Sequence, residues 1–200
     1  MSILNVEHVS HSFGGRSILE DVSFRLLKGE HVGLIGANGE GKSTFLNIIC
    51  GKLAPESGKV EWCRHITTGY LDQHTVLSKG MSIHQVLETA FAHLFELEKE
   101  LLQMYEKMCD CSEDEMNILM QDVGEIQDIL EHSGFYMIDT KINEVASGLG
   151  LLDLGLDKDV TMLSGGQRMK VLLAKLLLEN PMILILDGAY TLAYHFLTKL

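Results

Sequence analysis

The feature that most constrains this chain is a glycine-rich loop, Gly36–Ser43, with the sequence Gly-Ala-Asn-Gly-Glu-Gly-Lys-Ser. It fits the pattern G-x-x-x-x-G-K-[ST], and it lies between the apolar run 31–35 and a segment, 43–49, that is predicted to be helical. Because the apolar run is continuous, it predicts a strand covered on both faces. The glycines allow backbone N–H groups to face a phosphate chain, Lys42 can reach its outer phosphates, and Ser43 can hold Mg²⁺. The sequence therefore predicts a phosphate-binding strand, loop and helix unit.

Two downstream features fit the same chemistry. Residues 182–186 form a second apolar run, predicted to be a buried strand, and Asp187 follows it directly. A carboxylate at a strand end near a phosphate loop is suited to ordering Mg²⁺. Before that strand, Leu163–Gln167 reads Leu-Ser-Gly-Gly-Gln and opens a helix expected over about 166–178. This second glycine turn at a helix N-terminus predicts a second phosphate contact.

The middle of the chain has a different character. Apolar residues recur there at intervals of 3, 4, 3 and 4 in two successive sets: Leu94, Leu97, Leu101, Met104, Met108, and then Met116, Leu119, Val123, Ile126, Leu130. Two such sets predict two coiled-coil helices, and the short break between them predicts an antiparallel hairpin. Ser112 with Glu115 predicts the N-terminal cap of the second helix, and Ser133-Gly134 predicts its end.

The net charge is concentrated in this hairpin region. The 200 residues carry 28 acidic and 16 basic side chains, a formal charge of −12. Residues 84–140 contain fourteen acids and two lysines, so this segment alone accounts for −12 and the rest is neutral. An acidic chain is unsuited to simple electrostatic binding of DNA or RNA. No apolar run is long enough to span a bilayer, and the four cysteines are not spaced as a disulfide scaffold. We therefore expect a cytoplasmic protein with reduced thiols and no membrane domain.

In the order of its motifs, the chain resembles the ATP-binding cassette superfamily over residues 1 to about 187. Gly-Ala-Asn-Gly in the phosphate loop and the hairpin ahead of Leu163–Gln167 are most similar to the ABC-F subgroup, whose members bind the ribosome and affect translation or antibiotic resistance. The resemblance implies a P-loop NTPase α/β core of ABC type, with an antiparallel β subdomain and a helical hairpin insertion. The implied ligands are ATP and Mg²⁺. The implied nucleotide contacts are Phe13, Gly36, Ala37, Asn38, Gly39, Glu40, Gly41, Lys42, Ser43, Thr44 and Gln73.

The resemblance also implies roles for particular residues. Phe13 would stack on adenine, and Gln73 would touch Mg²⁺ together with Ser43 and Asp187. Residues of the second glycine turn would contact the ATP of a partner cassette: Ser164, Gly165, Gly166 and Gln167. Such a second cassette, which this chain does not contain, is the expected partner, and the ribosome is a partner by family.

The resemblance ends after Asp187. Family members continue with Glu-Pro-Thr-Asn, whereas this chain has Gly188 where the catalytic glutamate is expected. Removing one guanine from a plausible coding sequence restores Asp-Glu-Pro-Thr, so we predict that 188–200 is an out-of-frame tail on a C-terminally truncated protein. Genuine divergence of this segment is the alternative. The expected division is 1–83 (first part of the cassette core), 84–140 (helical insertion), 141–187 (signature helix and metal-site strand) and 188–200 (tail). We expect Mg-ATP binding with impaired hydrolysis. The alternative is a fragment of the ATPase subunit of an ABC transporter.

Overall fold

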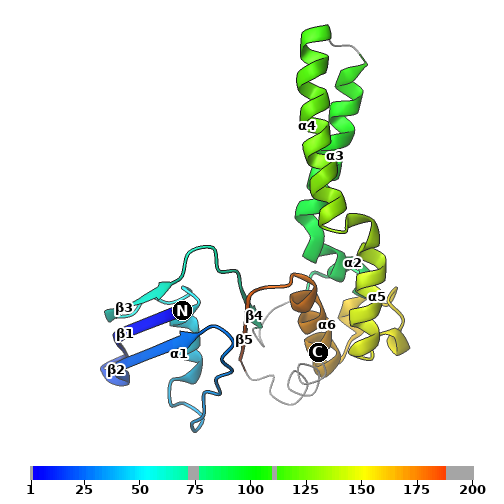
Figure 1. Cartoon of the computed structure of the whole chain (residues 1–200). Coiled ribbons are helices and arrows are strands. Elements are labelled where there is room, and N and C mark those ends of the chain that lie inside the picture. The colour runs from blue at the N-terminus through cyan, green and yellow to red at the C-terminus, as the bar shows by residue number, and fades with distance from the viewer. Residues whose placement is uncertain (1, 72–76, 110–111, 188–200) are drawn as a thin grey trace. The chain divides into compact units, whose positions relative to one another are not determined.

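A computed structural model describes residues 2–71, 77–109 and 112–187 of the chain (Figure 1). The chain divides into two compact units. The first comprises residues 1–73 and 181–190, and the second comprises residues 74–180 and 191–200. Each unit has its own secondary structure, mainly strands in the first and helices in the second.

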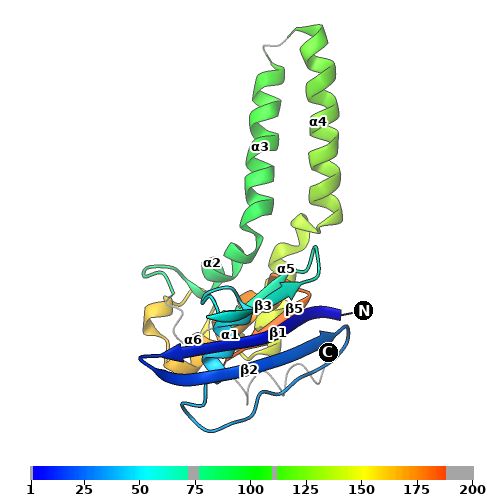
Figure 2. The ribbon, with the colours of Figure 1, turned by 90° about the vertical axis from the view of Figure 1, so that its left-hand side faces the viewer.

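The first unit contains a three-stranded antiparallel sheet of β1 (Ser2–Phe13), β2 (Arg16–Leu27) and β3 (Ser57–Trp62). The strand order is β2-β1-β3, and Val6 of β1 lies opposite Phe24 of β2 and Val60 of β3. Figure 2 shows β1 between its two neighbours. Alternating apolar and polar residues in 4–9 and 22–26 are typical of half-buried strands, and both segments lie within longer strands, β1 and β2.

Helix α1 (Lys42–Ile49) packs against this sheet. It is the helix expected after the glycine loop, and its apolar residues share a core with β1, to which Ile185 also belongs. Burial of apolar side chains, rather than helix propensity, stabilises so short a helix. The core residues are Leu4, Val6, Val9, Leu19, Phe45, Ile48, Ile49 and Ile185.

A second, parallel sheet in this unit pairs β4 (Thr68–Leu71) with β5 (Ile183–Leu186), with Tyr70 opposite Ile185. Strand β5 is the expected strand before Asp187. The strand expected at 31–35 is wrong, because these residues have no regular structure and Ile35 is 94% exposed. An inner strand depends on backbone hydrogen bonds to neighbouring strands. Among the described residues only β4 and β5 form a parallel pair, and 31–35 joins neither.

The second unit is helical, and its most extended part is a hairpin of α3 (Ala92–Met108) and α4 (Glu113–His132), which lie side by side in both views (Figures 1 and 2). All ten residues of the two predicted apolar sets are buried or half-buried, as expected if the two sets face each other. Leu130 is fully buried, and Gln127 Nε2 donates to Tyr105 Oη across the hairpin at 2.7 Å. The antiparallel hairpin is therefore confirmed.

Both predicted ends of α4 are also confirmed. Glu115 accepts hydrogen bonds from the N–H and the hydroxyl of Ser112, at 3.0 and 2.7 Å, and these bonds lower the pKa of the Glu115 carboxyl. Gly134 follows α4 in the left-handed conformation, with φ 68°.

The remaining helices of the second unit are shorter. The expected span of α6 (Gly165–Leu178) is confirmed, and its apolar residues Val171 and Leu173 are buried. None of the helices among the described residues is long and apolar enough to cross a membrane. The other helical segments are α2 (Ile83–Glu88), η1 (Thr89–Phe91), η2 (Phe135–Met137), α5 (Ile138–Gly148), η3 (Leu152–Leu154) and η4 (Val160–Met162).

Candidate functional site

The glycine-rich loop ends at the N-terminus of α1, where Gly41 caps the helix. Gly41 adopts φ 86°, and its carbonyl accepts the first helical hydrogen bond, from Phe45 N–H at 2.8 Å. A Cβ atom at Gly41 would lie 2.6 Å from Ile18 Cγ2 and 3.2 Å from Ile18 O. Both the backbone conformation and the close approach of β2 therefore require glycine at this position.

Charged side chains of the loop bind its own backbone. Lys42 Nζ donates to the carbonyls of Gly36 and Ala37 at 2.7 and 2.6 Å. The Glu40 carboxylate accepts the Ala37 N–H at 2.6 Å. Lys42 is half-buried in the first turn of α1, and the neighbouring Ser43 is exposed. The lysine and the serine predicted for phosphate and metal contacts thus lie together at the helix N-terminus, where the macrodipole favours anions.

The other predicted loop residues are also accessible. Asn38 and Gly39 are exposed, and Gly39 has φ 87°, another left-handed conformation. Thr44 is half-buried in the first turn of α1.

Phe13 lies at the end of β1 with 53% of its surface exposed, so its ring is available to a ligand. It pairs with Arg16 at the start of β2, two residues before Ile18, which touches the position of Gly41. Strand β2 thus pairs with Phe13 at Arg16 and lies against the phosphate loop at Ile18. The buried His11 ring makes an edge contact with Phe13, with 4.7 Å between centroids.

Asp187 lies at the end of β5 and is connected to α1 by a tyrosine. The Tyr70 hydroxyl lies 3.4 Å from Asp187 Oδ2 and 3.4 Å from Asn47 Oδ1. Asn47 lies one turn after Ser43 on α1, so these two residues share a helix face. Tyr70 therefore places the predicted metal carboxylate toward the face of α1 that carries Ser43. The sequence contained no signal for Tyr70, whereas the four-residue spacing of Asn47 from Ser43 could have been noticed.

The second glycine turn begins α6 with a reciprocal cap. Ser164 Oγ accepts the Gln167 N–H at 3.3 Å, and Gln167 Oε1 accepts the Ser164 N–H at 3.0 Å. Gly165 and Gly166 are exposed, and their N–H groups, in the first turn, have no partner within the helix. The cap already uses one acceptor each of Ser164 and Gln167.

Three predictions lie outside the described residues, namely the Mg²⁺ contact of Gln73, the position of Gly188, and the tail 188–200. The prediction of reduced thiols is consistent with Cys50, Cys63 and Cys109, which are free. Burial raises the pKa of the Cys50 thiol.

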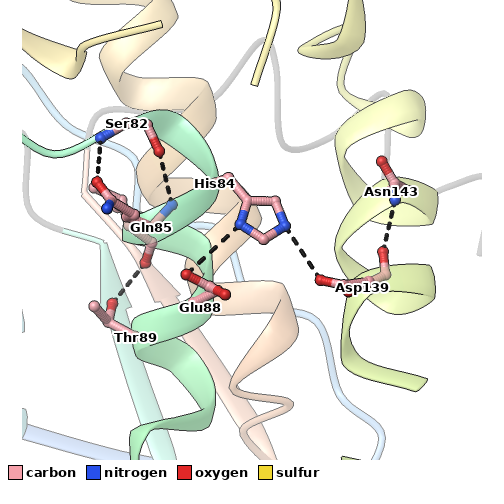
Figure 3. Close-up of polar contacts among 8 residues, drawn as sticks. Ser82, His84, Gln85, Glu88, Thr89, Asp139 and Asn143 are labelled. Atoms are coloured by element: carbon pink, nitrogen blue, oxygen red, sulfur yellow. Dashed lines mark hydrogen bonds and ion pairs between the residues drawn. The ribbon is translucent and has the colours of Figure 1, made fainter. Parts of the chain in front are cut away.

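A second polar cluster lies in the helical unit, between α2 and α5 (Figure 3). His84 Nδ1 is 3.6 Å from Glu88 Oε2, and His84 Nε2 is 3.3 Å from Asp139 Oδ1. These three residues could offer metal ligands, but the imidazole itself lies between the carboxylates and each nitrogen faces a different one. This geometry is that of a histidine that links two helices through contacts with a carboxylate on each.

The profile of the family described as ABC transporter matches residues 19–191. The chain belongs to the ABC transporter family. It is an ATP-binding domain of this superfamily and a nucleotide-binding domain.

Relatives of this ABC domain come from several organisms. It is 63% identical over 187 residues to the uncharacterized ABC transporter ATP-binding protein YfmM of Bacillus subtilis, covering 94% of this chain and 36% of that protein. It is 32% identical to ABC transporter F family member 2 of Arabidopsis thaliana, covering 92% and 28%. It is 30% identical to the energy-dependent translational throttle protein EttA of Mycobacterium tuberculosis, covering 92% and 32%. The chain thus spans about a third of the length of these relatives.

Solved structures confirm the fold. The structure described as an ATP-binding subunit of an ABC transporter superposes with a TM-score of 0.66 at 22% identity, covering 98% of this chain and 72% of that one. The predicted ABC-type P-loop NTPase fold is therefore confirmed.

Proposed function

We propose that this chain binds Mg-ATP through the loop Gly36–Ser43. The observation that carries this proposal is the arrangement at the N-terminus of α1, where Gly41 holds a left-handed cap and places Lys42 and Ser43 in the first helical turn. Helix N–H groups and a lysine ammonium are the groups that bind nucleotide phosphates. Ser43 and Asp187 supply oxygen ligands of the kind that Mg²⁺ prefers. Phe13 contacts the base, and Gln73 completes the metal site by resemblance.

Hydrolysis by this chain should be slow. Asp187 is followed by Gly188, and glycine has no carboxylate with which to activate water. Loss of a general base removes about 10²–10⁴-fold in rate. The turn Ser164–Gln167 would contact the ATP held by a second cassette, so a single cassette lacks half of each composite site. The division into 1–83, 84–140, 141–187 and 188–200 belongs to the same proposal.

The finer assignment that we propose is the ABC-F subgroup, with the ribosome as target. It is supported by the F family member and the translational throttle protein among the relatives, and by the position of the α3/α4 hairpin ahead of the Ser164 turn. Helix α4 carries seven acidic residues and no lysine or arginine, so a basic protein is a better contact for it than RNA.

The second candidate is the ATPase subunit of a membrane transporter, which the printed name of the YfmM relative favours. The long coiled-coil hairpin argues against it, because the ATPase subunits of transporters usually carry a different helical insertion at this place. Such a subunit would also need a membrane partner. Sedimentation with ribosomes separates the two candidates. The ABC-F proposal expects binding that is lost when 92–132 is replaced by a short linker, and absence of binding by the intact chain would refute it.

The nucleotide proposal is tested by titrating the chain with a fluorescent ATP analogue in the presence of Mg²⁺. We expect saturable binding that unlabelled ATP displaces and that Lys42→Ala weakens at least tenfold. Lys28→Ala, which removes the charge of an exposed lysine outside the loop, is the matched control. Equal binding by the wild-type and Lys42→Ala chains would place the nucleotide elsewhere.

A further inference from the structure

The side chain of Glu40 folds back onto the phosphate loop. Its Oε2 atom lies 2.6 Å from Ala37 N, while Glu40 N lies 3.4 Å from Ala37 O, so that residues 37–40 form a turn closed at both ends. A Cβ atom on Gly36 would come within 2.7 Å of the same carboxylate oxygen. The carboxylate therefore lies directly against the backbone that the glycine pattern reserves for phosphate.

These contacts use the groups that phosphate needs. Backbone N–H groups of the loop are donors to phosphate oxygens, and a carboxylate is an anionic acceptor of the same kind. The Lys42 ammonium, in turn, donates to the carbonyls of Gly36 and Ala37. A triphosphate that enters this loop must replace the carboxylate at Ala37 and draw the lysine away from these carbonyls.

We propose that Glu40 is an internal competitor of the nucleotide phosphates and sets the affinity of the loop for ATP. The carboxylate acts by occupying the Ala37 N–H, and the nucleotide binds by displacing it. This inference rests on the proposed nucleotide-binding function, and it assigns to Glu40 a role in regulating that site.

A different explanation would be general repulsion between the Glu40 charge and the phosphates. The two explanations separate in the variant Glu40→Asp, which keeps the negative charge but shortens the side chain by one methylene. If occupation of the Ala37 N–H matters, the shorter side chain releases it and binding tightens. If only charge matters, Glu40→Asp binds like the wild type and only neutral variants bind more tightly.

The chain contains a matched control for this contact. Glu30 Oε2 accepts the Leu27 N–H at 2.8 Å, and Glu30 N donates to Leu27 O at 3.2 Å. This turn has the same three-residue spacing and the same carboxylate contact, but it lies outside the phosphate loop. Glu30 and Glu40 are both exposed, so substitutions at either position are expected to leave the fold intact.

The experiment measures dissociation constants of Mg-ATP and Mg-ADP for the 200-residue chain and for Glu40→Asp, Glu40→Ala, Glu30→Asp and Glu30→Ala. Removing a charge-assisted hydrogen bond at an exposed position should tighten binding by about three- to tenfold in both Glu40 variants. Both Glu30 variants should bind within about twofold of the wild type. Unfolding curves without nucleotide check that all five chains are folded.

Three results would overturn the inference. These are Glu40→Asp with wild-type affinity, Glu40 variants that bind more weakly, and Glu30 variants that tighten binding as much as the Glu40 variants. If the wild type binds nucleotide and all variants bind equally, the inference fails while the nucleotide-binding function stands. If no chain binds nucleotide, the nucleotide-binding function fails and the inference with it.

Discussion

Replacing Gly41 by alanine tests whether the phosphate loop is built as the structure has it. Two costs are expected. The residue adopts φ 86°, which an L-amino acid enters at a cost of about 1–2 kcal/mol. The new methyl group would also lie 2.6 Å from Ile18 Cγ2 and 3.3 Å from Leu19 Cδ2. Overpacking of this kind costs about 1–3 kcal/mol, so Gly41→Ala should lower the free energy of unfolding of the first unit by about 2–5 kcal/mol.

Gly39→Ala is the matched control for the packing part of this cost. Gly39 has nearly the same backbone conformation, φ 87°, but a Cβ atom there meets nothing within 4 Å. This variant should therefore show only the backbone cost of about 1–2 kcal/mol. The difference between the two variants measures the contact of Gly41 with β2.

The assay is urea unfolding followed by the fluorescence of Trp62, the only tryptophan of the chain. Trp62 lies on β3 and donates from Nε1 to the carbonyl of Ile49 in α1 at 2.8 Å, so its emission reports on the first unit. In an Ile18→Ala background, Gly41→Ala should cost about 1–3 kcal/mol less than in the wild type, because the clashing methyl group is gone. Equal costs for Gly39→Ala and Gly41→Ala would refute the reasoning.

Three further predictions concern burial and charge. Leu130→Ala should destabilise the hairpin by about 2–5 kcal/mol, because the Leu130 side chain is fully buried. Ile129→Ala, at a position 47% exposed, should cost less than about 1 kcal/mol, and urea unfolding followed by circular dichroism measures both costs. His11→Leu should raise the stability of the first unit by about 1 kcal/mol in the Trp62 assay, because both buried ring nitrogens of His11 have no hydrogen-bond partner among the described residues; a loss of stability would contradict this. Hydrogen bonds lower the pKa of the Glu115 carboxyl, so the stability that this carboxylate gives to the start of α4 is present above the ordinary carboxyl pKa and is lost as the pH falls through the lowered pKa. Over that range the protection of the first α4 amides from hydrogen exchange should fall in the wild type and stay constant in Glu115→Gln.

Features determined by neighbours along the chain were predictable from the sequence. The spacing of Leu94, Leu97 and Leu101 predicts a helix seam because side chains three and four residues apart share a helix face. The cap at Ser112 follows from local side-chain chemistry. The same holds for the loop before Lys42, in which glycine spacing and the following helix predict the backbone.

Features determined by contacts distant in sequence were not predictable in this way. The apolar run that ends at Ile35 has the composition of a strand, but a strand also requires an adjacent partner. The contact of Tyr70 with Asp187 joins residues 117 positions apart, and neither residue type indicates the other. The contact of Glu40 with the Ala37 N–H depends on the turn geometry of the folded loop, which the residue types alone do not indicate.

The central claim is that the loop before α1 binds Mg-ATP, and the most direct test is the effect of nucleotide on the unfolding of the first unit. A ligand that binds only the folded state at 100 times its dissociation constant adds about 2.7 kcal/mol to the free energy of unfolding. The account predicts a shift of this size in the Trp62 transition for the wild-type chain at that Mg-ATP concentration. In Lys42→Ala, whose affinity is at least tenfold lower, the shift at the same concentration should be at most about 1.4 kcal/mol. A wild-type transition that does not move at any Mg-ATP concentration, or one that moves equally in Lys42→Ala, would contradict the account.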